Sequence, residues 1–179
     1  MGTPKALLRV EGETFLARTI RTLRSGGCDP VLVVVASDTG AGAVDVAERA
    51  GGRVLFNPDP GEGPITSLRL AIRSLEGSVG GLAYLPVDHP MVRPETVAAL
   101  LSAAREAGAA LTVPTHRGKR GHPAVFGTAL FAELADPALE GGARAVVHRH
   151  LESAQLIEVD DAGVVIDIDT PEAYATVAG

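Results

Sequence analysis

The sequence predicts an α/β domain of three layers, with helices on both faces of a mainly parallel sheet, and three features indicate it. Residues 81–87 form a short apolar run closed by turn residues, which is typical of a buried strand. Residues 31–36 form a second, mostly β-branched run that also favours a strand. Segments with helical periodicity alternate with these and other short apolar runs, which is the pattern of an α/β fold.

The length and composition of the chain fit one domain with an aliphatic core. The chain has 179 residues, of which 46% are hydrophobic and only 3% aromatic. The formal charge of −6 and the scarcity of aromatic side chains argue against nucleic acid as a partner. Cys28 is the single cysteine, so neither an intramolecular disulfide nor a cysteine-rich metal site is expected. No segment has the pattern of a signal peptide or a membrane span, so we expect a cytoplasmic protein without a membrane partner.

The individual elements follow from local signals. Thr14 can cap the first helix, and Gly26-Gly27 can end it. The apolar face of this helix is Phe15, Leu16, Ile20 and Leu23. Further helices are expected at residues 43–50, 65–75, 95–107, 128–134 and 142–151, with a last one from Pro171, and further strands at 53–56, 111–113, 123–126, 155–159 and 164–168.

Asp88 is the first candidate functional residue, because it ends the apolar run 81–87. Open α/β sheets bind ligands at the carboxyl ends of their strands. Pro86 and Pro90 disfavour a helix here, so the carboxylate should point outwards. Such an oxygen ligand suits Mg²⁺ and leaves coordination positions for nucleotide phosphates. The alternative is a turn residue, or a cap for the helix that begins near Pro94.

Two further segments are candidates for nucleotide contacts. Lys5, at the end of a loop, can contact phosphate, although a lysine near a terminus is more often solvated. Residues 57–64 form a loop rich in proline and glycine that opens the helix 65–75. The exposed amide groups at its start can face an anion or a nucleobase. Asn57 either hydrogen-bonds a base or ribose or forms the turn, and both interpretations stay open.

Residues 116–123 carry the densest positive charge in the chain. Arg120 can hold phosphate, Gly121 allows a ligand to approach the backbone, and His122 can donate a hydrogen bond. Alternatively, the segment is a solvated hairpin tip and His122 is a packing residue.

Asp167 and Asp169 occupy alternate positions of a predicted extended segment and therefore lie on one side of it. Either can complete a cation site with Asp88. The alternative is that Asp169 or Thr170 caps the last helix, with Pro171 at its start.

Taken in order, these segments resemble the molybdenum cofactor nucleotidyltransferase family, the MobA-like NTP transferases, and within it the molybdopterin cytidylyltransferase branch. The resemblance rests on residues 1–8 (Met-Gly-Thr-Pro-Lys-Ala-Leu-Leu), 57–63 with Ser67, 86–90 (Pro-Val-Asp-His-Pro), 120–123 (Arg-Gly-His-Pro), 141–144 (Gly-Gly-Ala-Arg) and 167–172 (Asp-Ile-Asp-Thr-Pro-Glu).

The resemblance implies a Rossmann-like nucleotidyltransferase fold, similar to that of nucleotide-diphospho-sugar transferases. It also implies transfer of a nucleoside monophosphate from an NTP, CTP or GTP, to a phosphorylated acceptor such as molybdopterin, with a molybdoenzyme or its accessory protein as a partner. Carried over by position, Lys5 contacts the triphosphate and Asp88 holds Mg²⁺ with Asp167 or Asp169. The loop of Asn57 and Gly63, with Ser67, lies near the nucleotide. Residues Arg120, Gly121, His122 and Pro123 face the acceptor.

The sequence departs from the family pattern at its start. Family members place a strand and a glycine-rich loop before the segment equivalent to residues 1–8, and neither is found in these 179 residues. We therefore expect a single domain over 1–179 that lacks this strand and phosphate loop. Strands 31–36 and 81–87 should then flank a slot with unpaired backbone groups. Two other functions are compatible with the pattern: a nucleotidyltransferase for a sugar phosphate or phospholactate, and a non-catalytic nucleotide-binding accessory protein.

Overall fold

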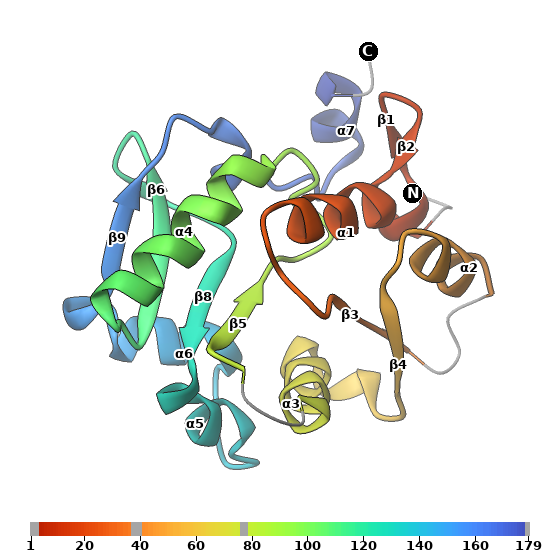
Figure 1. The fold of residues 1–179 in the computed structure, drawn as a ribbon. Coiled ribbons are helices and arrows are strands. Elements are labelled where there is room, and N and C mark those ends of the chain that lie inside the picture. The colour runs from red at the N-terminus through yellow and green to blue at the C-terminus, as the bar shows by residue number, and fades with distance from the viewer. Residues whose placement is uncertain (1–3, 37–40, 76–78, 178–179) are drawn as a thin grey trace.

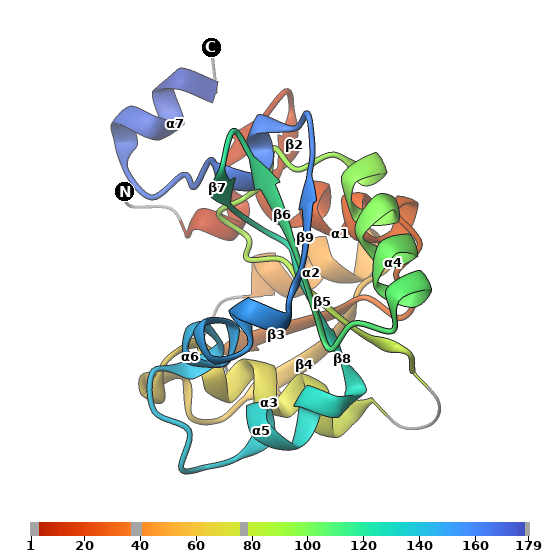
Figure 2. The same cartoon turned by 90° about the vertical axis from the view of Figure 1, so that its left-hand side faces the viewer.

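The computed structural model describes residues 4–36, 41–75 and 79–177 (Figure 1). It has the expected three layers, and Figures 1 and 2 show strands between two groups of helices. One group is α1 (Phe15–Ser25), α2 (Ala41–Arg49) and α4 (Pro94–Ala107). The other is α3 (Pro64–Ser74), α5 (Phe131–Ala135) and α6 (Gly142–Arg149). No helix of the described residues is both long and apolar enough to cross a membrane.

The strands form a mixed arrangement. β3 (Leu32–Ala36) pairs in parallel with β4 (Arg53–Asn57). A five-stranded sheet has the order β5 (Gly81–Tyr84), β8 (Ala124–Gly127), β6 (Leu111–His116) and β7 (Lys119–Arg120), and β9 (Gln155–Glu158) joins β6 in parallel. β8 is antiparallel to both of its neighbours. The sheet is therefore mixed rather than mainly parallel, because the hairpin after β6 reverses the chain before β8 inserts beside β5.

Short elements complete the chain. β1 (Arg9–Val10) and β2 (Glu13–Thr14) form a small hairpin, and α7 (Pro171–Val177) ends the described residues. Turns of 3-10 helix are η1 (Lys5–Leu7), η2 (Pro60–Glu62), η3 (Thr128–Leu130), η4 (Leu151–Ser153) and η5 (Ala162–Val165).

The residues next to the helix ends correctly predicted where α1 begins and where α4 ends. The Thr14 side chain accepts a hydrogen bond from the Ala17 amide at 3.2 Å, as expected for a helix cap. At the end of α4, Gly108 adopts a left-handed conformation with φ of 59°, which glycine allows without strain. These ends were predictable because each depends on residues within one turn of the helix.

The predicted strand at residues 164–168 is wrong. The chain forms η5 here, because the carboxylate of Asp161 accepts a hydrogen bond from the Gly163 amide at 3.0 Å and starts a tight turn. A Cβ on Gly163 would lie 2.2 Å from the carbonyl oxygen of Met91, so the turn also needs glycine for its close approach to the neighbouring backbone.

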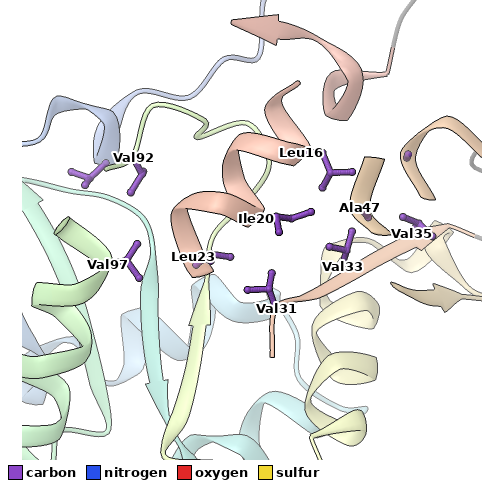
Figure 3. Packing of buried hydrophobic residues seen from close by; sticks show 11 residues of the cluster. Leu16, Ile20, Leu23, Val31, Val33, Val35, Ala47, Val92 and Val97 are labelled. Atoms are coloured by element: carbon purple, nitrogen blue, oxygen red, sulfur yellow. The ribbon is translucent and has the colours of Figure 1, made fainter. Parts of the chain in front are cut away.

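Two large cores lie on opposite faces of the strands. In the first, Leu16, Ile20 and Leu23 of α1 face the side chains of β3 and of α2 (Figure 3). The second packs α3, α5 and α6 against β6 and β8, with Phe126 and Leu134 fully buried. Both cores are mainly aliphatic, as the composition predicted.

A third, small core joins the two ends of the described chain. Val10, Phe15 and Ile168 are buried together, and α7 covers them. The rings of Phe15 and Tyr174 meet edge to face with centroids 5.9 Å apart, and the Tyr174 hydroxyl donates to the Arg9 carbonyl at 2.8 Å. This core brings η1 beside the segment that carries Asp167 and Asp169.

A slot separates β3 from β5. Within the described residues these strands belong to different sheets and are not hydrogen-bonded to each other. The space between them has a volume of about 1020 Å³ and is bounded by residues 31–36 on one side and 81–88 on the other.

Cys28 lines this slot and gives a pH-dependent prediction. Burial raises the pKa of its thiol from 9.0 to about 11. At about pH 8 its thiolate fraction should therefore be about 100-fold below that of an exposed thiol. We expect alkylation by iodoacetamide to be slowed to the same degree, and to speed up about tenfold for each pH unit up to about pH 11. Labelling followed by mass spectrometry checks this, and a rate equal to that of free cysteine near pH 8 would contradict it.

Candidate functional site

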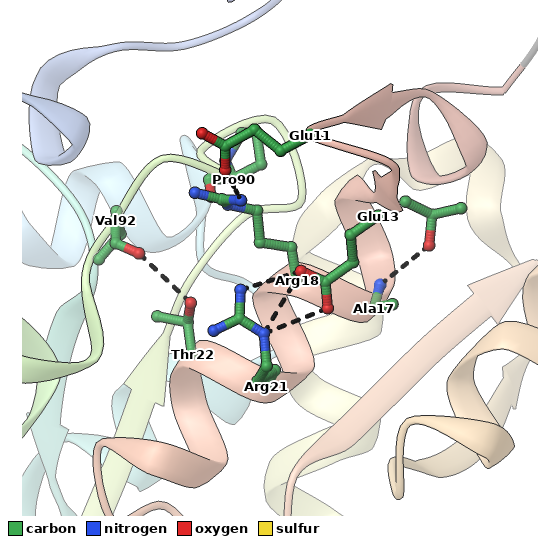
Figure 4. Close-up of polar contacts among 9 residues, drawn as sticks. Glu11, Glu13, Ala17, Arg18, Arg21, Thr22, Pro90 and Val92 are labelled. Carbon is green, nitrogen blue, oxygen red and sulfur yellow. Dashed lines mark hydrogen bonds and ion pairs between the residues drawn. The ribbon is translucent and has the colours of Figure 1, made fainter.

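The loop that carries Asp88 is fixed by α1 (Figure 4). Arg18 donates from Nε to the Pro90 carbonyl at 2.8 Å, and Thr22 donates from Oγ1 to the Val92 carbonyl at 3.3 Å. A third bond runs from the Ile168 amide to the Asp88 carbonyl at 2.9 Å. The loop of Asp88 is therefore held by α1, and the Asp88 carbonyl is hydrogen-bonded to Ile168, which lies between Asp167 and Asp169.

The Asp88 carboxylate is partly buried and has an unsatisfied oxygen. Oδ1 is buried without a hydrogen-bond partner, and the nearby Nε2 of His89 lies 3.9 Å away, beyond hydrogen-bonding distance. Burial raises the pKa of this carboxyl above its usual value; His89 lowers it, the charge of Asp169 raises it and that of Lys5 lowers it. A buried carboxylate oxygen without a donor fits a cation ligand better than a turn residue.

Lys5 and Asp169 form an ion pair next to Asp88. The hydrogen bond to Asp169 raises the pKa of Lys5, burial opposes this, and the charges of Asp169, Asp88 and Asp167 raise the pKa further. In turn, the bond from Lys5 lowers the pKa of the Asp169 carboxyl. Thr170, not Asp169, caps α7, since its Oγ1 accepts from the Ala173 amide at 3.2 Å. The structure thus brings Lys5, Asp88 and Asp169 together, with Asp167 close enough to influence the lysine.

These residues fit a Mg²⁺ ion that is completed by phosphate. In the described part of the chain, no group of three or more His, Cys, Asp or Glu side chains is arranged to hold a metal by itself. Mg²⁺ is usually bound by one or two carboxylates together with substrate phosphates and water. The open oxygen of Asp88 with Asp169 or Asp167 beside it matches that donor set.

The Asn57 side chain organises the β4–α3 turn. It is buried, and its Nδ2 donates to Thr66 Oγ1 at 2.8 Å and to Ser67 Oγ at 3.1 Å. Its Oδ1 accepts from the Asp59 amide at 3.0 Å. Of the two interpretations left open by the sequence, these bonds support the turn former.

Gly63 and Ser67 sit at the start of α3. Gly63 has φ of 91°, a conformation that favours glycine, and its carbonyl accepts from Thr66 Oγ1 at 2.9 Å. No side chain caps this helix, but Pro64 has no N–H and the Thr66 amide donates to the Gly63 carbonyl at 3.3 Å, so few amides of the first turn are open to an anion. Ser67, on α3, and Asp88, in the turn after β5, both line the slot.

The segment 120–123 lies where β7 leads into β8. Arg117 and Gly118 form the hairpin tip with φ of 50° and 75°, and Arg120 is exposed. Gly121 is tightly enclosed, since a Cβ there would lie 2.0 Å from the Val164 carbonyl oxygen. Pro123 is buried. Only part of this predicted acceptor loop is therefore a solvated tip.

The ring of His122 packs against two others. Its centroid lies 4.7 Å from that of His89 and 6.1 Å from that of Tyr84. Burial and the neighbouring His89 lower the pKa of His122 to about 4, so its ring is neutral at physiological pH. The Nδ1 atoms of both histidines are buried without hydrogen-bond partners.

Sequence reasoning did not single out His89 or Asp161. His89 connects Asp88 to residues 120–123 through its ring contact with His122, and its position next to Asp88 was the available signal. Asp161 is buried and accepts from the Arg93 amide at 2.9 Å and from Thr96 Oγ1 at 2.6 Å. It thereby fastens the start of α4 to the chain that leads to Asp167, a contact that no local pattern reveals.

The chain is similar to several known proteins. Residues 1–154 match the family model of the MobA-like NTP transferase domain. Nicotine blue oxidoreductase of Paenarthrobacter nicotinovorans is 30% identical over 178 residues, which cover 94% of this chain and 85% of that protein. The structure of Rv0371c of Mycobacterium tuberculosis H37Rv in complex with manganese superimposes with a TM-score of 0.78 at 25% identity, covering 99% of this chain and 92% of that one.

Other relatives are matched over only part of their length. The bifunctional IPC transferase and DIPP synthase of Rubrobacter xylanophilus is 40% identical over 102 residues, which are 56% of this chain and 22% of that protein. A probable molybdenum cofactor guanylyltransferase of Opitutus terrae is 29% identical over 93 residues, which are 51% of this chain and 43% of that protein.

Proposed function

The chain belongs to the family of MobA-like NTP transferase domains, and we propose that it transfers a nucleoside monophosphate from an NTP to a phosphorylated acceptor with release of pyrophosphate. CTP is the proposed donor and molybdopterin the proposed acceptor. The observation that supports this best is the buried, unpartnered Oδ1 of Asp88 beside the Lys5–Asp169 ion pair. It provides cation-binding oxygens and a positive charge at one place, as a triphosphate requires.

The reaction needs few protein groups. An oxygen of the acceptor phosphate forms a bond to the α-phosphorus, and the bond from that phosphorus to the bridging oxygen of the β-phosphate breaks, so that pyrophosphate leaves with the electron pair. The acceptor oxygen is already ionised, so no general base is required. Catalysis then consists of aligning the reacting groups and neutralising their charge.

Each residue of the site has a defined role in this proposal. Asp88, with Asp169 or Asp167, holds Mg²⁺, which supplies charge neutralisation at the phosphates when bound. Lys5 contacts the triphosphate, and its ion pair with Asp169 keeps the ammonium group in place. Asn57 positions the loop that carries Gly63 and the first turn of α3, which lies near the nucleotide.

The acceptor is proposed to lie against residues 120–123. Arg120 is exposed there and can pair with phosphate, while neutral His122 can donate a hydrogen bond. The match to a molybdenum cofactor guanylyltransferase supports a pterin phosphate, and with it a molybdoenzyme or its accessory protein as recipient of the product. A sugar phosphate is the alternative acceptor within the same reaction class.

A panel assay tests the proposal. Pyrophosphate release is measured with each NTP and with Mg²⁺ or Mn²⁺, with and without molybdopterin or a sugar phosphate. We expect release only when NTP, metal and acceptor are all present, with CTP as the best donor. Nucleotide binding without pyrophosphate release from any pair would indicate an accessory protein instead. Because one relative is named an oxidoreductase, the panel also includes oxidation of a reduced nicotinamide, which we expect to be absent.

A further inference from the structure

A groove separate from the proposed catalytic site is lined by four arginines. It lies where α1, the β1–β2 hairpin and the carboxyl-terminal end of α2 meet, and these elements are neighbours in Figure 1. Arg9 comes from the hairpin, Arg21 and Arg24 from α1, and Arg49 from α2. The volume is about 570 Å³, within the range of about 300–1,000 Å³ that is usual for small-molecule sites.

One acidic side chain, Glu13, lines the groove within the described part of the chain, and Arg21 already binds it (Figure 4). Arg21 donates from Nε to Glu13 Oε1 at 3.2 Å and from Nη2 to Oε2 at 2.9 Å. The carboxylate nearest to Arg49 is that of Asp45, at 3.8 Å, which is longer than a hydrogen bond. Arg9, Arg24 and Arg49 therefore have no hydrogen-bonded carboxylate among the described residues.

The guanidinium group of Arg24 is held in place without losing its charge. Its Nη1 donates to the Gly51 carbonyl at 2.7 Å, and a carbonyl is neutral. A Cβ on Gly51 would lie 2.9 Å from this Nη1 and 3.2 Å from Cζ, so the group lies directly against the backbone of Gly51. Among the described residues, no hydrogen bond uses Nε or Nη2 of Arg24, and these donors remain for a ligand.

The guanidinium group of Arg9 is held in the same way. Its Nη1 donates to the Gly12 carbonyl at 2.6 Å, across the turn of the β1–β2 hairpin. The Arg9 backbone is fixed too, because its carbonyl accepts from the Tyr174 hydroxyl at 2.8 Å. Side chains that are ordered before binding lose less freedom when a ligand arrives, which favours affinity.

The ends of the helices explain only part of this charge. Arg24 and Arg49 lie in the last turns of α1 and α2, where basic side chains offset the helix dipole. Each helix end carries about half a negative charge, so the two ends together offset about one of the three free guanidinium groups. Arg9 lies on a strand and has no such role. An excess of positive charge therefore remains in the groove.

The lining indicates which kind of anion fits. Guanidinium groups bind phosphate oxygens through two parallel hydrogen bonds, and two of these groups are already oriented here. No aromatic side chain lines the groove in the described part of the chain, so a base or another ring finds no stacking surface. Several arginines in a groove of this volume suit an anion with more than one phosphate group.

We propose that this groove binds an oligophosphate through Arg9, Arg24 and Arg49, either inorganic diphosphate or the diphosphate group of a nucleotide. None of these residues belongs to the proposed catalytic site around Lys5 and Asp88. The inference therefore goes beyond the proposed reaction and does not depend on it.

Calorimetric titration with pyrophosphate tests the proposal. The protein is Lys5→Gln, which lacks the phosphate contact of the proposed catalytic site, and EDTA removes divalent metal. We expect one pyrophosphate per chain, an affinity at least about tenfold higher than for orthophosphate, and a decrease of affinity as salt rises. CDP is titrated in parallel. Equal affinity for CDP would assign the groove to the diphosphate of a nucleotide, and weaker affinity would assign it to free diphosphate.

Two variants locate the binding, each made in the Lys5→Gln protein. Arg24→Gln should weaken pyrophosphate binding at least about tenfold, because a charged pair of hydrogen bonds is lost. Arg49→Gln should also weaken it, and this side chain is 84% exposed, so folding should be unaffected. Arg73→Gln is the matched control. It removes the same charge from the last turn of a helix, α3, outside the groove, and affinity should stay within about twofold.

Four results would overturn the proposal. Absence of binding would mean that the arginines only offset the helix ends. Binding to the unmodified protein that disappears in Lys5→Gln would belong to the catalytic site. Equal affinity for orthophosphate would mean general attraction of anions. Equal affinity of Arg24→Gln, Arg49→Gln and Arg73→Gln would place the ligand elsewhere. Each readout is binding, so a failure of the proposed reaction would leave these results unaffected.

Discussion

Asp88→Asn is expected to lower kcat for pyrophosphate release by about 100-fold or more while the protein stays folded. Asparagine keeps the shape of the side chain but removes the charge that would hold a cation at the buried Oδ1 position. Steady-state rates at saturating NTP, with Mg²⁺ varied, measure the effect. We expect the loss mainly in kcat, with a weaker apparent affinity for Mg²⁺.

The stability of this variant should change in the opposite direction. Burial raises the pKa of Asp88, which means that the fold disfavours its ionised form. A neutral amide removes this penalty, so thermal unfolding should occur at the same or a higher temperature than in the unmodified protein. Inactivity combined with retained stability is typical of a residue kept for function.

Asp45→Asn is the matched control. Asp45 lies on α2, is 61% exposed and pairs only loosely with Arg49 at 3.8 Å. A surface pair of this kind contributes little, so turnover should stay within about twofold of the unmodified protein. Turnover of Asp88→Asn in the same range as Asp45→Asn would remove Asp88 from the catalytic site.

Prediction from the sequence worked where the signal is local. The cap at Thr14 and the stop at Gly108 each depend on neighbouring residues, and both lie where expected. The apolar run before Asp88 was correctly predicted to contain a strand, although the paired part of β5 is only Gly81–Tyr84. That strand is shorter than predicted because the prolines and the turn after Tyr84 leave the sheet.

Prediction failed where a distant contact decides the local structure. Val164 and Val165 have high strand propensity, but the turn at Asp161 is fixed by Arg93 and Thr96, far away in the sequence. The same limit applies to His89, whose ring contacts that of His122, 33 residues later in the chain, in the segment between β7 and β8. The mixed sheet follows from the path of β8, which no periodicity encodes.

The second large effect concerns Gly121, which was predicted to face the acceptor. Gly121→Ala is expected to lower the free energy of unfolding by about 3 kcal/mol, because the new methyl group would overlap backbone atoms that cannot rotate away. Its Cβ would lie 2.0 Å from the oxygen and 2.5 Å from the carbon of the Val164 carbonyl. The Gly121 amide donates to the Pro114 carbonyl at 2.9 Å, and the His122 amide donates to the Val164 carbonyl at 2.8 Å. These bonds hold the backbone at Gly121 and at Val164, so neither segment can move away without breaking one.

Urea denaturation measures this loss, and Gly80→Ala is the control. No atom lies within 4 Å of a Cβ at Gly80, so its alanine variant should stay within about 0.5 kcal/mol of the unmodified protein. Any relaxation that admits the methyl group at Gly121 must push η5 away from β7, and Ile168, whose amide donates to the Asp88 carbonyl, lies three residues after the end of η5. Turnover in Gly121→Ala should therefore fall even under conditions in which the protein is fully folded. A variant as stable as Gly80→Ala would show that β7 and η5 are not in tight contact, and that Gly121 serves only to admit a ligand.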